Sequence, residues 1–324
     1  MNPTTDVPAP GDSLPPASTP SPLTTEPRWI GISFILMTSV MWSTSGAFVK
    51  SPPFAEMPAD TRGLFLACFR AMFAGIFLFP LALRGRFSWE RTMGWMLLSF
   101  AVMNITFITA MSYTTAAAAI FLQCTSALWA PIMGVFFLGE SFSRAHKFGL
   151  VPIVLGIVLF VFWDLRPEYL IGNLLALISG VAYAGVVVTL RRLRDHNPFY
   201  LAALNNFLSG LVVLPWLLFA GFFSGPHAPE TIHWVLAVAM GIVQLGLPYV
   251  LFSFGLKRVT AGEASLLVLI EPILNPLFVW LMWSIPVLMR DVWGGAFILT
   301  GLALRYLLEY QARRKSGKSA NSVS

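Results

Sequence analysis

Ten long apolar runs constrain the fold of this chain more than any other feature of its sequence. Each run is close to 20 residues long, which is the length of an α-helix that crosses the hydrocarbon core of a bilayer. The runs span residues 29–49, 63–83, 93–112, 115–138, 148–164, 170–190, 199–222, 234–255, 260–283 and 292–311. The sequence therefore predicts an all-α integral membrane protein with ten transmembrane helices.

Composition excludes the soluble classes. The chain is 56% hydrophobic and only 11% charged, whereas about 25% of the residues in ordinary soluble domains are charged. The net charge of +6 is therefore not read as a nucleic-acid-binding feature. Residues 1–28 contain eight prolines and no apolar run, so they are predicted to form a disordered tail. Residues 312–324 form a short basic tail.

The distribution of Lys and Arg predicts how the chain is oriented. Cytoplasmic loops of membrane proteins carry an excess of these residues. With the N-terminus inside, sixteen of them fall on the inner side and four on the outer side, namely Lys50, Arg62, Arg166 and Arg290. Both termini are therefore expected in the cytoplasm, with the chain in the inner or plasma membrane.

The two halves of the chain resemble each other. In the fourth and ninth runs, Thr115, Ala116, Ala119 and Pro131 match Thr260, Ala261, Ala264 and Pro276, and similar matches continue through other runs. Each half, 29–164 and 170–311, holds five runs, which is an odd number, so the second half must enter the membrane from the opposite side. Inverted repeats are typical of transporters in which two halves rock around a site at the midplane.

These residues resemble a known family. The pattern Met41-Trp42-Ser43, the run Tyr113-Thr114-Thr115-Ala116-Ala117, Leu138-Gly139-Glu140 and Glu271-Pro272 are similar to those of the EamA-type drug/metabolite transporters, which have two five-helix repeats. The second half has Ser284-Ile285-Pro286 where the first has Gly139-Glu140, which puts a shared role for Glu140 in doubt. The resemblance implies export of amino acids or other metabolites by alternating access.

Charged residues inside predicted spans are costly, and each is a hypothesis for a functional site. Three such residues are Arg70, Glu263 and Glu271. Glu263 lies one turn into its span and is interpreted as reaching the inner interface. Arg70 and Glu271 lie at similar depth, so they either form a buried pair that holds helices together or bind solute. In the second case Glu271 binds an ammonium group or a proton, and Arg70 binds a carboxylate.

Polar and aromatic residues complete the candidate substrate site. Gln123 is expected to face a cavity, and Trp42 and Tyr183 occupy equivalent positions in the two halves, where they either pack or act as lids. The candidate substrate-binding residues are Trp42, Arg70, Gln123, Tyr183, Gln244, Tyr249 and Glu271. Gly149, Gly156, Gly294 and Gly301 are interpreted as sites of close helix packing.

The sequence carries no arrangement that indicates catalysis. The four histidines lie in loops or at span edges, Cys68 and Cys124 have no partner at metal-ligand spacing, and no Walker-type glycine loop is present. No enzyme activity, cofactor, metal or nucleic-acid partner is predicted. The leading hypothesis is a secondary transporter of a small organic metabolite, with a proton as a candidate coupling ion. The alternatives are a nucleotide-sugar or phosphate exchanger, a membrane-embedded transferase, and a membrane scaffold.

Overall fold

The computed structural model describes residues 27–84, 88–139, 144–163, 166–225, 228–259 and 261–321. Within these ranges all regular secondary structure is helical and no strand occurs, which confirms the predicted all-α class. Most of the predicted N-terminal tail, and Glu140, lie outside the described residues. The predicted basic tail continues the last helix as far as Asn321.

The helices follow one another along the chain with short connections. Their bounds are α1 (Arg28–Ser43), α2 (Ser45–Val49), α3 (Pro52–Ala55), α4 (Ala59–Ala82), α5 (Arg91–Tyr113), α6 (Ala116–Gln123), α7 (Ser126–Leu138), α8 (Arg144–Phe162), α9 (Pro167–Arg192), α10 (Pro198–Phe219), α11 (Thr231–Ala239), the π-helix η1 (Met240–Gly246), α12 (Leu247–Leu256), α13 (Ala261–Val268), α14 (Glu271–Trp283) and α15 (Met289–Asn321).

Nine segments of the described chain are long and apolar enough to cross a membrane. They coincide with nine of the ten predicted runs, with edges that differ by a few residues. The remaining run, 148–164, corresponds to a shorter apolar helix, Lys147–Phe162. The chain is thus a multi-pass membrane protein.

Four of the spans are not continuous α-helices, which the apolar runs did not predict. The fourth span breaks at Cys124 and Thr125, where the Thr125 hydroxyl donates to the carbonyl of Leu122 at 2.6 Å. Such a bond offers the backbone an alternative to the helical ladder. The ninth span breaks at Leu269 and Ile270, just before Pro272, which has no N–H to continue the ladder. The first span breaks at Thr44, and the eighth passes through η1.

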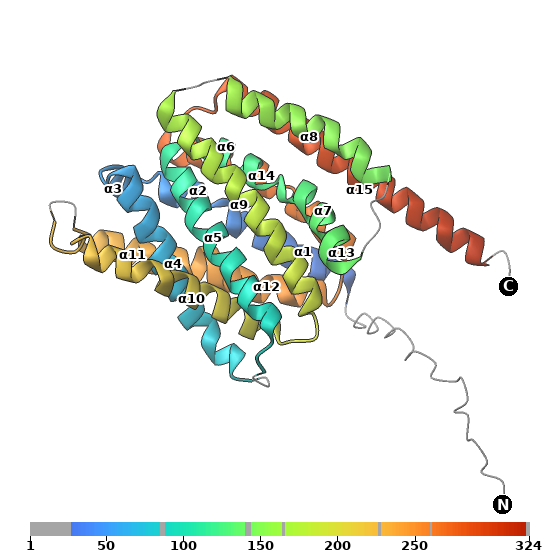
Figure 1. The fold of residues 1–324 in the computed structure, drawn as a ribbon, viewed down its shortest axis with the longest axis horizontal. Helices are drawn as coiled ribbons and strands as arrows, with labels where there is room; N and C mark the ends of the chain where they lie inside the picture. The colour runs from blue at the N-terminus through green and yellow to red at the C-terminus, as the bar shows by residue number, and fades with distance from the viewer. Residues whose placement is uncertain are drawn as a thin grey trace, which may run out of the picture.

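Helices α8 and α15 lie side by side along one edge of the bundle (Figure 1). Glycines at the crossing allow this approach. A Cβ atom on Gly149 would lie 2.8 Å from the carbonyl oxygen of Gly301, and one on Gly156 would lie 2.7 Å from that of Gly294. The four glycines therefore pair with one another across the two halves, which confirms their interpretation as packing residues.

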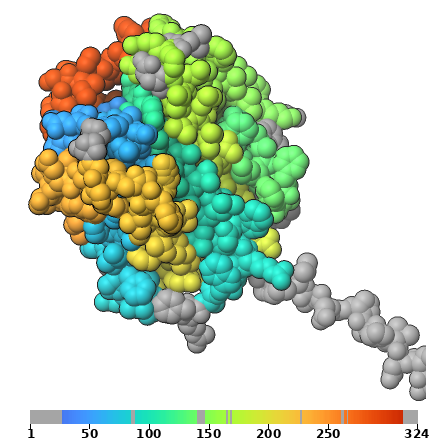
Figure 2. Space-filling view, turned by 60° about the vertical axis from the view of Figure 1, so that its left-hand side comes forward, coloured from blue at the N-terminus to red at the C-terminus, as the bar shows by residue number. Residues whose placement is uncertain are grey.

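The two halves also meet at a second place in the bundle. Figure 2 shows the segment that contains α3, in blue, directly against α11, in gold. The buried ring of His233 in α11 contacts the carbonyl oxygen of Pro53 through Nε2 at 2.9 Å. Contacts of this kind make the two halves one body, so residues from both can share a central site.

Candidate functional site

The buried guanidinium of Arg70 in α4 is held by one amide from each half of the chain. Its Nη1 atom donates to Oε1 of Gln244 at 3.1 Å, and its Nη2 atom donates to Oδ1 of Asn104 at 2.7 Å. Asn104 lies thirteen residues after the first residue of α5, Arg91, and Gln244 lies thirteen residues after the first residue of α11, Thr231. Arg70 thus sits between equivalent positions of the third and eighth spans.

Arg70 does not pair with Glu271 in this structure. Among the described residues, no carboxylate oxygen lies within 4.0 Å of the Arg70 guanidinium. The buried charge is compensated instead by neutral carbonyl oxygens of side-chain amides, which satisfy a buried cation through hydrogen bonds. Arg70 and Glu271 lie at similar depth along their helices, but they do not form a direct ion pair.

The π-helix η1 brings Gln244 to this position. Pro248 follows η1 by two residues, and a proline disrupts the helical bond to the carbonyl four residues before it, here that of Gln244. Gly241 lets η1 approach α4, because a Cβ atom there would lie 2.7 Å from the carbonyl oxygen of Arg70. Nε2 of Gln244 then donates to the carbonyl of Trp42 at 3.3 Å. A π-helical turn at a functional site is a recurrent arrangement.

Glu271 lies at the break in the ninth span, as the first residue of α14. The N-terminus of a helix favours a negative charge. The Glu271 side chain is only half-buried, and it lies within electrostatic range of Tyr183, Tyr249 and Cys124. Of the two charged candidates at the centre, Glu271 is therefore accessible, and Arg70 is enclosed at 4% exposure.

The aromatic candidates surround the same region. The ring of Trp42 packs edge-on against Tyr249, with 5.8 Å between centroids, and against Phe252 at 5.5 Å. Tyr249 also lies in range of both Arg70 and Glu271. Tyr183 is 39% exposed and lies in electrostatic range of Glu271 and Tyr249.

Gln123 takes a separate position. It is buried and is the last residue of α6, directly before the break in the fourth span. The structure thus brings Trp42, Arg70, Gln244 and Tyr249 into one contact network, with Glu271 and Tyr183 within electrostatic range of Tyr249. No hydrogen bond within the described residues connects the Gln123 side chain to Arg70 or Glu271.

Two polar groups were missed as candidates from the sequence. The first is Asn104, whose role depends on the position of Arg70. The second is Asp291, which is only 1% exposed but lies directly before the predicted tenth run and so falls outside the residues that hydropathy selects. The sequence signal that could have identified Asp291 is its position, since it is an acidic residue beside Arg290 and directly before an apolar run.

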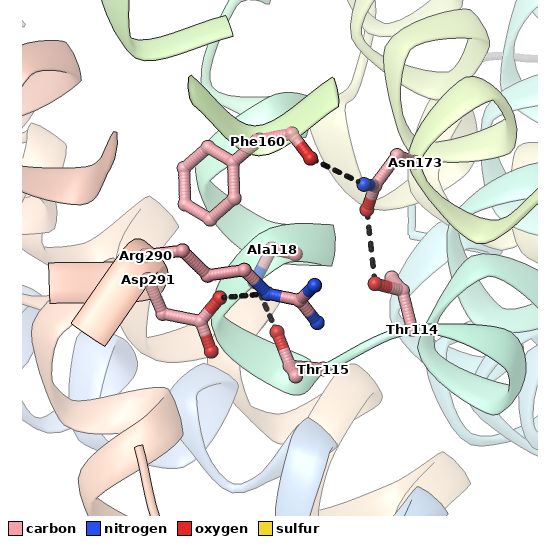
Figure 3. A network of polar contacts seen from close by, with 7 residues as sticks. All are labelled: Thr114, Thr115, Ala118, Phe160, Asn173, Arg290 and Asp291. Carbon is pink, nitrogen blue, oxygen red and sulfur yellow. Dashed lines mark hydrogen bonds and ion pairs between the residues drawn. The ribbon is translucent and has the colours of Figure 1, made fainter. Parts of the chain in front are cut away.

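Asp291 belongs to a polar network with residues at the start of α6 and in α9 (Figure 3). Its Oδ1 atom lies 3.6 Å from Nε of Arg290, and the hydroxyl of Thr115 accepts the N–H of Ala118 at 3.0 Å. Thr114 and Phe160 are bridged by Asn173, whose Oδ1 accepts the Thr114 hydroxyl at 2.9 Å. The network borders a pocket of about 220 Å³ lined by residues of both halves.

Lys50 forms another wall of this pocket. It follows α2, and its Nζ atom donates to the carbonyl oxygen of Thr114 at 2.8 Å. Burial, together with the positive charge of Arg62, lowers the pKa of Lys50 from 10.5 to about 8. The described residues hold no group of three or more His, Cys, Asp or Glu side chains that could hold a metal ion.

Comparison with known proteins decides the family. The profile of the EamA-like transporter family matches this chain twice, over residues 29–162 and 170–307. The chain belongs to the EamA-like transporter family. The two matches coincide with the two five-run halves that internal similarity predicted, so the expected resemblance is confirmed.

Relatives across this family are transporters of small metabolites. A protein of Archaeoglobus fulgidus named as an uncharacterised transporter is 27% identical over 282 residues, which cover 85% of this chain and 96% of that protein. The pseudopaline exporter of Pseudomonas aeruginosa is 25% identical, with coverages of 85% and 95%. The biotin transporter of Escherichia coli is 22% identical, with coverages of 73% and 79%. A solved crystal structure with 20% identity has the same fold, with a TM-score of 0.61 over 87% of this chain and 99% of that one.

Proposed function

We propose that this EamA-family protein is a secondary active transporter that exports a small organic metabolite of the amino-acid class by alternating access. The observation that carries the proposal is a pair of matched helix breaks. The fourth span breaks at Cys124–Thr125 and the ninth at Leu269–Ile270, and the two breaks stand in equivalent positions of the two halves. Discontinuous helices at the midplane are where transporters of this general design bind their solutes.

The central charges have different roles in this proposal. Arg70 is enclosed by two amides, so it positions Gln244 and Tyr249 and sets the local positive field. Glu271 is accessible at the start of α14, and it is the group that takes an ammonium group of the solute or a proton. This replaces the simpler assignment in which Arg70 binds the solute carboxylate directly. An ionisable residue inside a membrane span commonly marks a solute or proton path.

The proposal includes a topology. Lys147–Phe162 is the tenth crossing, because α8 packs along the full-length helix α15 and reaches the same edge of the bundle (Figure 1). Five crossings per half make the halves inverted, and the excess of Lys and Arg on one side puts both termini in the cytoplasm. Residues 29–164 and 170–311 then form the two repeats.

Transport by the protein reconstituted in vesicles tests the proposal. Flux of a panel of radiolabelled amino acids is measured with and without a pH gradient, for the natural sequence, for Glu271→Gln and for Glu263→Gln. Glu263 is the matched control, because it lies in the same span but forms a partly exposed ion pair with Arg28.

We expect a pH-dependent flux for at least one amino acid. Glu271→Gln should reduce it by about tenfold or more, equivalent to about 1.4 kcal/mol, and Glu263→Gln should change it by about twofold at most, since exposed ion pairs contribute little. A panel without any driven flux would contradict the proposed substrate class. Equal flux for the natural protein and Glu271→Gln would remove Glu271 from the path.

A further inference from the structure

The outer pocket lies between the two halves of the chain. Lys50 and Thr114 line it from the first half, and Tyr169, Pro276 and Asp291 line it from the second. Its volume of about 220 Å³ is below the roughly 300 Å³ at which pockets for drug-sized ligands begin. The space therefore suits a single small metabolite.

Asp291 gives this pocket a buried anion with unused hydrogen-bonding capacity. Its side chain is 1% exposed. The Thr115 hydroxyl, the Leu288 backbone and the Arg290 guanidinium lie near the carboxylate, but neither of its oxygens has a hydrogen bond of full geometry among the described residues. The 3.6 Å contact with Nε of Arg290 is longer than a hydrogen bond. The guanidinium of Arg290 also stacks on the ring of Tyr169 at 4.2 Å. Buried carboxylates are normally hydrogen-bonded, and an ammonium group is the donor that would complete Asp291.

Lys50 gives the same pocket a cation. Its Nζ atom donates to one carbonyl oxygen, that of Thr114, so an ammonium with three N–H donors can also donate to a carboxylate of the solute. The first residues of α6, Ala116 and Ala117, also line the pocket. The positive end of the α6 dipole adds to the field of Lys50 on this wall.

We propose that the outer pocket is a binding site for a zwitterionic solute of the α-amino-acid type, with the solute ammonium on Asp291 and its carboxylate on Lys50. This site is distinct from the central region around Glu271. Only the role of this site as an intermediate binding site during export rests on the proposed function. Binding itself requires only the opposite charges of Asp291 and Lys50 on the walls of one small pocket.

The lysines of this chain provide a direct readout. The sequence has five, Lys50, Lys147, Lys257, Lys315 and Lys318, and the proposed topology puts Lys50 alone on the outer side. A membrane-impermeant acylating reagent is added outside right-side-out vesicles of phosphatidylcholine and phosphatidylglycerol, which contain no primary amine. Mass spectrometry then measures the acylation rate of Lys50 relative to that of a soluble lysine peptide in the same mixture, which corrects for the reagent that amine-containing probes and lipids consume.

Three probes separate the two charges of the solute. They are L-leucine, 3-methylbutylamine, which lacks the carboxylate, and 4-methylpentanoate, which lacks the ammonium group. We expect saturating leucine to slow acylation of Lys50 by about tenfold, and each analogue at the same concentration by about twofold at most, since a site built for a polar group rejects analogues without it. Equal protection by all three probes, or by none, would overturn the proposal.

Variants locate the solute within the protein. Asp291→Asn should abolish protection by leucine, whereas Asp60→Asn, an exposed carboxylate in the first turn of α4, should preserve it. In each variant, protection is expressed relative to the acylation rate of Lys50 without leucine, so that a change in the reactivity of Lys50 itself does not count as lost protection. Natural protection in Asp291→Asn would overturn the proposal.

Glu271→Gln distinguishes this site from the central one. Lost flux with full leucine protection supports two separate sites, whereas lost protection would overturn the outer site and leave the central proposal standing. A lipid headgroup offers the same pair of charges, so a second set of vesicles contains phosphatidylethanolamine. Protection by this lipid alone, equal to that by leucine, would overturn the free-solute assignment in favour of the headgroup.

Discussion

The Nη1 atom of Arg70 lies 3.1 Å from the Oε1 atom of Gln244, and this bond connects α4 of the first half to the π-helix η1 of the second. Asn104 completes the arrangement from the other side at 2.7 Å. The cation is therefore satisfied by neutral groups, and its removal should affect those groups more than it affects Glu271.

A double-mutant cycle tests this relationship. Arg70→Met and Gln244→Leu should each lower the free energy of unfolding by about 1.5–3 kcal/mol, since hydrogen bonds to charged groups have that magnitude. The double variant should lose less than the sum by about 1 kcal/mol or more, as residues in contact do. The Arg70→Met and Glu271→Gln pair should be additive within about 0.5 kcal/mol. Unfolding in mixed micelles measures both, and coupling of Arg70 to Glu271 instead of Gln244 would contradict the structure.

The glycine contact between α8 and α15 predicts a large effect from a single methyl group. Gly149→Ala puts a Cβ atom 2.8 Å from the carbonyl oxygen of Gly301, and overpacking of this kind costs about 1–3 kcal/mol. Gly94 in α5 is the matched control, because no atom lies within 4 Å of a Cβ built there. Gly94→Ala should be neutral or stabilise by up to about 1 kcal/mol. Similar melting temperatures for the two variants would show that the contact is loose.

Lys50 predicts a pH dependence with a defined sign. Its pKa in the folded protein is about 8, below the ordinary 10.5. Between these values the unfolded chain binds more protons than the folded one, so the free energy of unfolding should rise with pH across this window. Lys50→Met should remove that increment. Among the described residues, Arg62, Tyr113, Tyr169 and Asp291 are the other titratable groups near Lys50 or on the walls of its pocket.

The same pKa is measurable by chemistry. The acylation rate of Lys50 should reach half its maximum near pH 8 instead of near pH 10.5, because only the neutral amine reacts. A midpoint close to that of a free lysine side chain would mean that Lys50 is solvated and that the outer pocket is more open than described.

Trp42 and Tyr183 predict opposite changes in access if they act as lids. With Cys68 and Cys124 replaced, a cysteine at position 123 is labelled from outside with an impermeant thiol reagent. Labelling should rise with Trp42→Ala and fall with Tyr183→Ala, because the second change favours the inward-open state. Trp42 packs on two other rings, so Trp42→Ala should also lower stability by about 3–5 kcal/mol. Shifts in the same sense would indicate that both aromatics only pack.

The proposed topology predicts where reporters become active. A cytoplasm-dependent reporter fused after Lys318 should be active, and one that requires the external side should be inactive. The prediction rests on the distribution of Lys and Arg, with sixteen residues on the inner side and four on the outer side. If only the external reporter is active, the C-terminus lies outside. That result would contradict ten crossings with a cytoplasmic N-terminus.

Hydropathy was sufficient to predict which segments form helices, because each apolar run overlaps one helical span. It could not predict the breaks, since the average over a window is the same whether Leu269 and Ile270 continue a helix or interrupt it. A direct pair of Arg70 and Glu271 was one of two alternatives because depth along a helix is readable from sequence, whereas the position of Gln244 depends on the π-helical turn. Asp291 was not predicted as a site residue because it lies directly before the predicted tenth run, which begins at residue 292.

Helix α15 runs without interruption from the outer pocket to Asn321. Its 33 residues give a length of roughly 50 Å at 1.5 Å per residue, against about 30 Å for the hydrocarbon core. The part of α15 beyond the hydrocarbon core amplifies small rotations of the helix. A tilt of about 5° at the Asp291 end would displace the other end of the helix by roughly 4 Å over a length of about 50 Å. A spin label or fluorophore near the C-terminus would therefore report events at the outer pocket without any change to the pocket itself.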